Sequence, residues 1–170
     1  MMLSLVKSLM QFIEFSIHRQ TGVTVQLIDL LKIVPDNNLT WSILDFYGIG
    51  SAPKGLTMPE FEKATRSIPG GHLFSWPELK AFADQLDQTW DCLIVAVESK
   101  NDLVPEELDA DNFNRCLIVL RAFDSTNWSV NARDMQLLKK FTKFSNLDQY
   151  SGMSNSRGAL LQRGPARLLK

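Results

Sequence analysis

The sequence has few of the residues from which catalytic and metal sites are most often built. Its 170 residues include only two histidines, His18 and His72, and two cysteines, Cys92 and Cys116. Neither histidine lies in a pattern typical of zinc ligands, and two thiols do not make a disulfide framework in a chain long enough to bury its own core. We therefore predict no metal, no cofactor and two buried free thiols. The sequence leaves open whether Cys92 and Cys116 lie close together.

Long apolar runs are also absent. No stretch of 18 uncharged apolar residues occurs, which predicts no membrane span. The N-terminal stretch has Lys7 inside its apolar part and Glu14 interrupting it, and no small-residue cleavage site follows, so it does not fit a signal peptide. We expect a cytoplasmic protein without a membrane partner.

Neither sign of charge dominates, since the chain has 18 basic and 19 acidic residues. The basic residues of the last twenty positions are Arg157, Arg163, Arg167 and Lys170, with no acid among them, so residues 1–150 hold 14 basic against 19 acidic side chains. An acidic body predicts no nucleic-acid partner, because phosphate contacts need clustered Lys and Arg. It suits a basic partner, although an acidic surface also serves solubility. We expect one domain over 1–145 and a basic, flexible tail over 146–170.

Hydrophobic periodicity predicts helices and strands in comparable numbers. Helices are expected over 3–17, 58–66, 75–88 and 132–144, and strands over 39–50, 89–99, 116–124 and 127–132. The stretch 24–34 is ambiguous: it is a helix capped by Thr24 and stopped by Pro35, or a strand followed by a hairpin, and we prefer the helix.

Two local signals are stronger than the others. Ser75 with Glu78 three residues later forms a capping box, and Pro77 lies in the first turn of the same helix. The short turn after Asp124 requires antiparallel pairing of the strands on either side of it. The prediction is a single α+β domain, with an antiparallel or mixed sheet of about four to five strands covered by helices.

Carboxylates are the remaining source of chemistry, because no G-x-S-x-G motif or phosphate-binding loop is present. Asp45, Glu98 and Asp124 each lie at or near the end of a predicted strand. If they converged they could bind a divalent metal, and the chain would be a small metal-dependent hydrolase or nuclease. Acids at strand ends more often bind turn backbones or face water, so we predict no catalytic residues and keep this site as an alternative.

Trp128 lies on a short strand just past a tight turn, where no catalytic group is near in sequence. It either covers the edge of the core or offers a large face to a partner, since aromatic residues are enriched at interface centres.

The end of the chain also carries a recognisable pattern. The stretch "FDSTNWSVNARDMQLLKKFTKF" resembles F-D-S-x-x-W-x-V/I-x-x-x-D-x-x-L-x-x-x-F, which closes many small bacterial immunity proteins of polymorphic-toxin and contact-dependent inhibition systems. The matching residues are Phe123, Asp124, Ser125, Trp128, Val130, Asp134 and Leu138. The stretches 39–50 and 73–97 are also similar to such proteins.

This resemblance implies a non-catalytic protein that binds and neutralises a cognate bacterial toxin domain, often a nuclease. The expected contacts are the acids of the connection before the third strand and one aromatic anchor: Glu106, Glu107, Asp109, Asp111 and Trp128. A further alternative is an accessory subunit that docks through the first predicted helix. The sequence does not identify the toxin or the oligomeric state.

Overall fold

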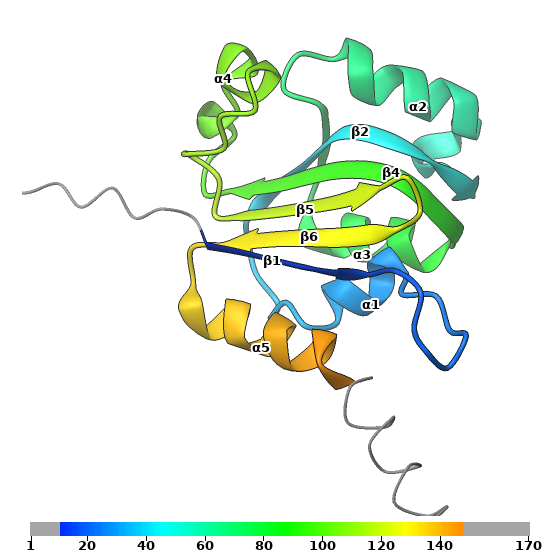
Figure 1. The fold of residues 1–170 in the computed structure, drawn as a ribbon. Coiled ribbons are helices and arrows are strands. Elements are labelled where there is room, and N and C mark those ends of the chain that lie inside the picture. Colours follow the sequence, from blue (N-terminus) through cyan, green and yellow to red (C-terminus); the bar gives the residue numbers. More distant parts are fainter. Residues whose placement is uncertain (1–10, 148–170) are drawn as a thin grey trace, which may run out of the picture.

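The structure, a computed structural model, describes residues 11–147, which form one antiparallel sheet with accompanying helices (Figure 1). Its six strands are β1 (Gln11–Ser16), β2 (Thr40–Gly50), β3 (His72–Phe74), β4 (Leu86–Val97), β5 (Ile118–Phe123) and β6 (Asn127–Ala132). The helices are α1 (Leu27–Leu31), α2 (Met58–Ser67), α3 (Trp76–Asp84), α4 (Pro105–Asp109) and α5 (Met135–Ser145). The strand order is β1-β6-β5-β4-β2-β3.

The α+β class and the antiparallel sheet are therefore confirmed, with six strands in place of the predicted four to five. The two additional strands are β1 and β3. None of the helices within residues 11–147 has the length and apolar character needed to cross a bilayer. The predicted basic tail lies outside the described residues from position 148 onward.

Residues 11–16 form a strand where the sequence predicted a helix over 3–17, and that prediction was wrong for this part. β1 pairs with β6, from Gln11 opposite Ala132 to Ser16 opposite Asn127. Its side chains alternate between the core and the outside, as a strand requires. The partner strand lies more than a hundred residues later in the chain, so local spacing could not reveal the pairing. The rest of the predicted helix lies outside the described residues.

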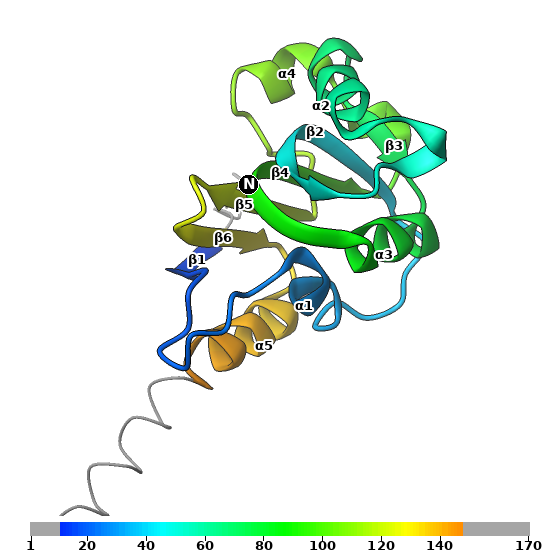
Figure 2. The same cartoon turned by 90° about the vertical axis from the view of Figure 1, so that its right-hand side faces the viewer.

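Helices α1, α3 and α5 cover one face of the sheet (Figure 2). Their apolar side chains meet inward side chains from all six strands in one large hydrophobic cluster. The largest fully buried members include Trp41, Phe46, Phe61, Trp128 and Phe141. Burying one large apolar side chain contributes about 1.5–3 kcal/mol. This cluster is therefore the main source of the stability of the fold.

The local sequence signals predict the start of α3 correctly but not that of α1. Ser75 and Glu78 form the predicted capping box at α3, and the Ser75 N–H donates to Glu78 Oε2 over 2.8 Å. The ambiguous stretch 24–34 contains the helix α1, which begins later than predicted, after Gln26 as N-cap. Thr24 instead forms an isolated antiparallel bridge with His18.

A β-bulge in β2 changes which of its side chains face the core. The register with β4 shifts between Ile43 and Asp45, so Leu44 is the additional residue. As a result Phe46 lies on the same face as Ile43 and is fully buried, while Asp45 pairs with Leu93 on the other face. Strict alternation along β2 would put Asp45 on the same face as Ile43, so the bulge exchanges the faces of Asp45 and Phe46.

The other face of the sheet is covered only in part. The connection 98–117 between β4 and β5, which holds the four acids expected to contact a partner, contains the short helix α4 and folds over β4 and β5. Beneath it lies a second, smaller hydrophobic cluster: Val95, Val97, Leu108, Cys116 and Val119. Within residues 11–147, no element covers this face over β1 and β6 (Figures 1 and 2).

Both cysteines are free and buried, as predicted. Cys92 belongs to the large cluster and Cys116 to the smaller one, so the two thiols lie on opposite sides of the sheet. Burial raises the pKa of Cys92 to about 12 and that of Cys116 to about 11. Both thiols are therefore protonated at neutral pH, which makes them poor nucleophiles.

Candidate protein-binding face

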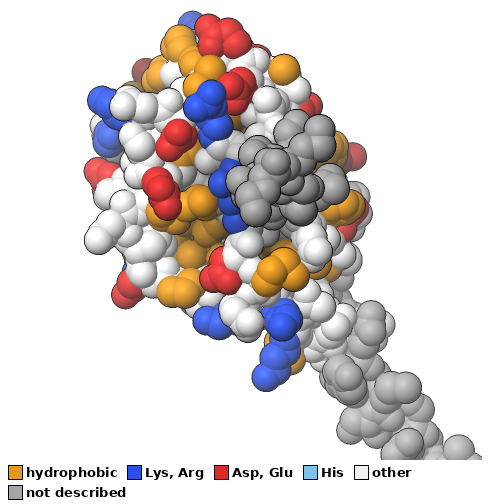
Figure 3. Space-filling view, turned by 90° about the vertical axis from the view of Figure 1, so that its left-hand side faces the viewer, with side chains coloured by type: hydrophobic (Ala, Val, Ile, Leu, Met, Phe, Trp, Pro, Cys, Tyr) orange, Lys and Arg blue, Asp and Glu red, His pale blue; other side chains and the backbone are white. Residues whose placement is uncertain are grey.

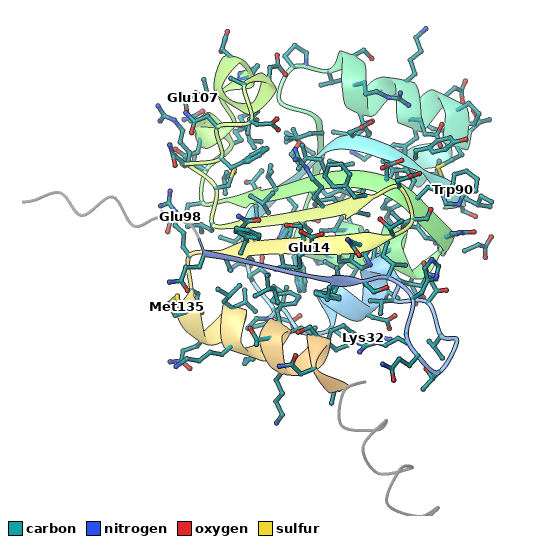
Figure 4. The ribbon with its side chains drawn as sticks, viewed as in Figure 1. Glu14, Lys32, Trp90, Glu98, Glu107 and Met135 are labelled. Carbon is teal, nitrogen blue, oxygen red and sulfur yellow. The ribbon has the colours of Figure 1, made fainter. Side chains whose placement is uncertain are left out.

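The uncovered part of the sheet presents polar and aromatic side chains, which we call the open face. Its members are Phe12, Glu14, Asp91, Arg121, Phe123, Asn127, Ser129 and Asn131. They share one side because directly paired residues project in the same direction: Glu14 is opposite Ser129, and Ser129 is opposite Arg121. Figure 4 labels Glu14, which lies on β1, the strand at the edge of this face.

Arg121 stands at the centre of the open face and is held there from several sides. Its Nη2 donates to Asp111 Oδ1 over 2.8 Å. Its guanidinium lies 5.7 Å from the ring centroid of Phe113 and 5.6 Å from that of Phe123, within cation–π range. An arginine fixed in this way loses little conformational freedom when a partner binds, and arginine is enriched among residues that dominate interfaces.

Exposed aromatic side chains stand at the borders of the open face. Phe12 is 64% exposed and Phe123 56% exposed. At the hairpin end, Tyr47 is 48% exposed and packs on Trp90 with ring centroids 4.6 Å apart. Exposed aromatic residues are enriched at surfaces that bind other proteins.

The hairpin between β5 and β6 is anchored to the neighbouring strand β4. Asp124 and Ser125 both have positive φ values, 43° and 54°, as in a type I′ turn. The Asp124 N–H donates to Asp91 Oδ1 over 2.8 Å, and the Ser125 N–H donates to the Trp90 carbonyl over 2.8 Å. These two bonds fix the position of Phe123 at the border of the open face.

A groove of about 570 Å³ runs between α2 and α4 beside the open face, and we call it the acidic groove. Apolar residues at its base and sides include Leu44, Ile68, Leu93 and Leu108. The α4 side carries Glu106, Asp109 and Asp111. On the α2 side Arg66 is 3.3 Å from Asp45, so its charge is already compensated. The groove is therefore negative along the α4 wall.

The four predicted contact acids differ in how far they are already paired. Glu107 makes two hydrogen bonds with Arg115, of 2.9 and 3.0 Å, and these bonds lower the pKa of Glu107. Asp111 is paired with Arg121. Glu106 and Asp109 are exposed and have no ion pair within residues 11–147. The charge left for a partner is therefore that of Glu106 and Asp109.

Trp128 does not lie on this surface. Its side chain is 0% exposed, and its indole Nε1 donates to the Val25 carbonyl over 3.0 Å. Because Trp128 alternates with Asn127 and Ser129 along β6, it points into the large cluster. Its expected role as an aromatic anchor for a partner was therefore wrong, and the core-covering interpretation holds.

The three strand-end carboxylates do not converge, so the alternative metal site was wrong. Asp124 lies beside Asp91, in the middle of β4, while Glu98 comes directly after the last residue of that strand. Figure 4 labels Glu98 and Trp90, the neighbour of Asp91, on opposite sides of the sheet. Seven residues of extended chain between Asp91 and Glu98 span roughly 23 Å. Among residues 11–147, no three His, Cys, Asp or Glu side chains are grouped closely enough to hold a metal ion.

Sequence reasoning missed Arg121 and the exposed aromatic residues around it. The available signal was a single arginine inside the apolar run "CLIVLRAF", because a charged residue in a strand marks a side that is not buried. That signal says nothing about which neighbouring strands share the exposed side. The acidic connection was found because its charge is local in sequence.

Comparison of the chain with protein-family models, with curated proteins and with solved structures gives no significant match in any of the three.

Proposed function

We propose that this chain is a binding protein that docks on a basic surface of a partner protein and blocks it, and that the partner is a bacterial toxin domain. The observation that carries the proposal is the acidic groove lying directly beside an arginine-centred, aromatic-bordered open face. Arginine and aromatic side chains are enriched at protein–protein interfaces, and acidic side chains beside them suit the rim of an interface, where charges steer association.

Charge supports a basic partner over an acidic one. Glu106 and Asp109 have no ion pair within residues 11–147, whereas Arg66, Arg115 and Arg121 on the surrounding elements are each paired with an acid. A nuclease domain is basic where it binds phosphates, so it offers the complementary surface. An immunity protein that covers such a surface would exclude the nucleic acid without any chemistry of its own.

The residues that carry the resemblance at the end of the chain occupy structural positions. Its Trp128 is buried and Asp124 lies in the turn, so the shared pattern describes a strand–turn–strand–helix framework. The residues proposed to contact the toxin lie on that framework or beside it, at positions outside the pattern apart from Phe123.

Co-purification tests the proposal. The full chain is expressed with a tagged toxin domain encoded beside it, and we expect a stoichiometric complex together with protection of the host cells. If the chain neither forms the complex nor protects cells, the proposed function is wrong.

Charge reversal then tests the site. Glu106→Lys combined with Asp109→Lys is expected to slow association by about tenfold or more at low ionic strength, with a smaller effect in high salt, because such charges steer the encounter. Asp84→Lys with Asp87→Lys makes the same change of net charge at the junction of α3 and β4, away from the groove, and is the matched control. Equal association rates for the two double variants would show that the acidic groove is not part of the interface.

A further inference from the structure

β1 is an edge strand of the sheet. It pairs with β6 on one side, and among residues 11–147 no strand lies on its other side, which we call the free edge (Figures 1 and 2). Figure 3 looks onto the end of the molecule at which β1 begins, where hydrophobic side chains lie among charged side chains of both signs. The backbone groups of an edge strand form a template on which another strand can pair.

The hydrogen bonds between β1 and β6 show which backbone groups face the free edge. The Ile17 N–H donates to the Thr126 carbonyl over 2.8 Å, and hydrogen-bonded pairs alternate with non-hydrogen-bonded pairs along an antiparallel ladder. Counted back from Ile17 in steps of two, Ile13 also bonds to β6. The residues on either side of it, Phe12 and Glu14, therefore direct their N–H and carbonyl groups toward the free edge.

The free edge lacks the features that usually prevent strand pairing. Protected edge strands are very short, or they carry lysine, proline or a β-bulge. β3, at the opposite edge of the sheet, has only three residues. β1 has six, with the sequence QFIEFS, and its register with β6 has no shift. Its one charged side chain, Glu14, accepts a hydrogen bond of 2.8 Å from Asn127 Nδ2 on β6, which holds the carboxylate away from the free edge.

Apolar side chains are accessible on both sides of β1. Phe12 is 64% exposed on the open face, whereas Ile13 and Phe15 are half-buried on the core side. A ligand that lay on one face of the sheet would cover only one of these two sets. A strand added beside β1 covers both, and it also receives the backbone hydrogen bonds that face the free edge.

A second β1, related to the first by a two-fold axis at Ile13, fits this edge. Phe12 then lies opposite Glu14 of the second copy, and each such pair exchanges both of its hydrogen bonds. The two Ile13 side chains meet on the core side. No two like charges are directly opposite in this register, whereas an axis at Glu14 would place the two carboxylates opposite each other.

We propose that β1 pairs with β1 of a second copy of the chain, antiparallel and centred on Ile13, so that the two sheets become one continuous sheet. Two-fold dimers are the commonest symmetric assemblies of soluble proteins. Directly opposed residues share a face, so both open faces lie on the same side of the joined sheet. The inference goes beyond the proposed function and does not depend on it.

Sedimentation equilibrium of the full chain tests the proposal, with a dimer that dissociates on dilution as the expected result. Glu14→Pro removes an N–H that faces the free edge and leaves the bonds to β6 in place, so it is expected to raise the dissociation constant of the dimer by about tenfold or more. Glu14→Ala is the matched control, because it removes the same carboxylate and keeps the N–H. It is expected to dimerise like the unmodified chain, and circular dichroism checks that both variants are folded.

Oxidative cross-linking tests the register. Cα atoms of a non-hydrogen-bonded antiparallel pair are about 4.5 Å apart, which a disulfide can span, so Ile13→Cys is expected to link the two copies. Gln11→Cys is the control on the same side of β1, because its two thiols would be about four residues apart along the strands, roughly 14 Å. Cys92 and Cys116 are buried and do not compete. A monomer at every concentration, equal dissociation constants for the two Glu14 variants, or equal cross-linking of the two cysteine variants would overturn the proposal.

Discussion

Replacing Trp128 with Phe gives the clearest measure of whether the indole is a core element or a partner contact. The substitution removes the donor to the Val25 carbonyl, and an unsatisfied buried acceptor costs about 1–3 kcal/mol. It also leaves roughly 40 Å³ unfilled, which at about 24 cal/mol per Å³ adds about 1 kcal/mol. We therefore expect Trp128→Phe to lower the free energy of unfolding by about 2–4 kcal/mol.

Urea unfolding followed by circular dichroism measures this loss, with the free energy obtained by linear extrapolation. Trp90→Phe is the control, because Trp90 is only half-buried, and it should cost about 1 kcal/mol or less. A loss below about 1 kcal/mol for Trp128→Phe would refute the burial and hydrogen-bond argument. A folded Trp128→Phe variant that no longer binds its partner would instead show that Trp128 belongs to the interface.

Three further outcomes follow from other parts of the structure. Ser125→Gly should stabilise the fold by about 0.5–1 kcal/mol in the same urea assay, because it relieves a left-handed φ of 54°, whereas Ser129→Gly in β6 should destabilise it by a similar amount. Burial lowers the pKa of His72 from its usual value near 6.5, so its contribution to stability is complete above that pH. The contribution declines as the pH falls from 6.5 toward the lowered pKa of the folded state, and His72→Phe should flatten the thermal-melting profile between pH 7 and 5.5; an unchanged profile would show that His72 is not the group responsible. Arg121→Ala should speed dissociation of the partner complex while changing the association rate much less, since an arginine at the centre of an interface acts mainly after docking; an unchanged dissociation rate would place Arg121 outside the interface.

Elements whose signals are local were predictable from the sequence. The capping box at Ser75 and Glu78 places the start of α3, and the short turn after Asp124 fixes the pairing of β5 with β6. Both depend on residues within a few positions of each other. For such elements sequence and structure agree, because tertiary packing selects a conformation that the local chain already favours.

Elements defined by distant partners were not predictable in the same way. Residues 13 and 17 satisfy a helical spacing and also fit the alternation of a strand. The strand forms because residues 11–16 can pair with the edge of β6. The bulge at Leu44 likewise depends on the register with β4. One additional residue there moves Asp45 out of the core and Phe46 into it, which reverses any assignment made by counting alternate positions.

The residues of the candidate site likewise differ in whether a local sequence signal could identify them. Glu106 and Asp109 could be proposed because an acidic connection is visible as a run of charge. Arg121 becomes significant only when Phe113 and Phe123 flank it and β1 and β6 prove to be uncovered on that side. Identifying a surface of this kind requires the strand order, which no local pattern contains.

The burial of Trp128 and the exposure of the open face both result from the alternation of side chains along β6. Along β6, Trp128, Val130 and Ala132 enter the core, while Asn127, Ser129 and Asn131 point outward. A strand that is polar on one side can remain uncovered in water, so β6 needs no helix on its outer side. The amide and hydroxyl groups there would be costly to bury against an apolar partner without hydrogen bonds. The chemistry of β6 therefore favours a partner that brings polar groups to the middle of the open face and apolar groups to Phe12 and Phe123 at its borders.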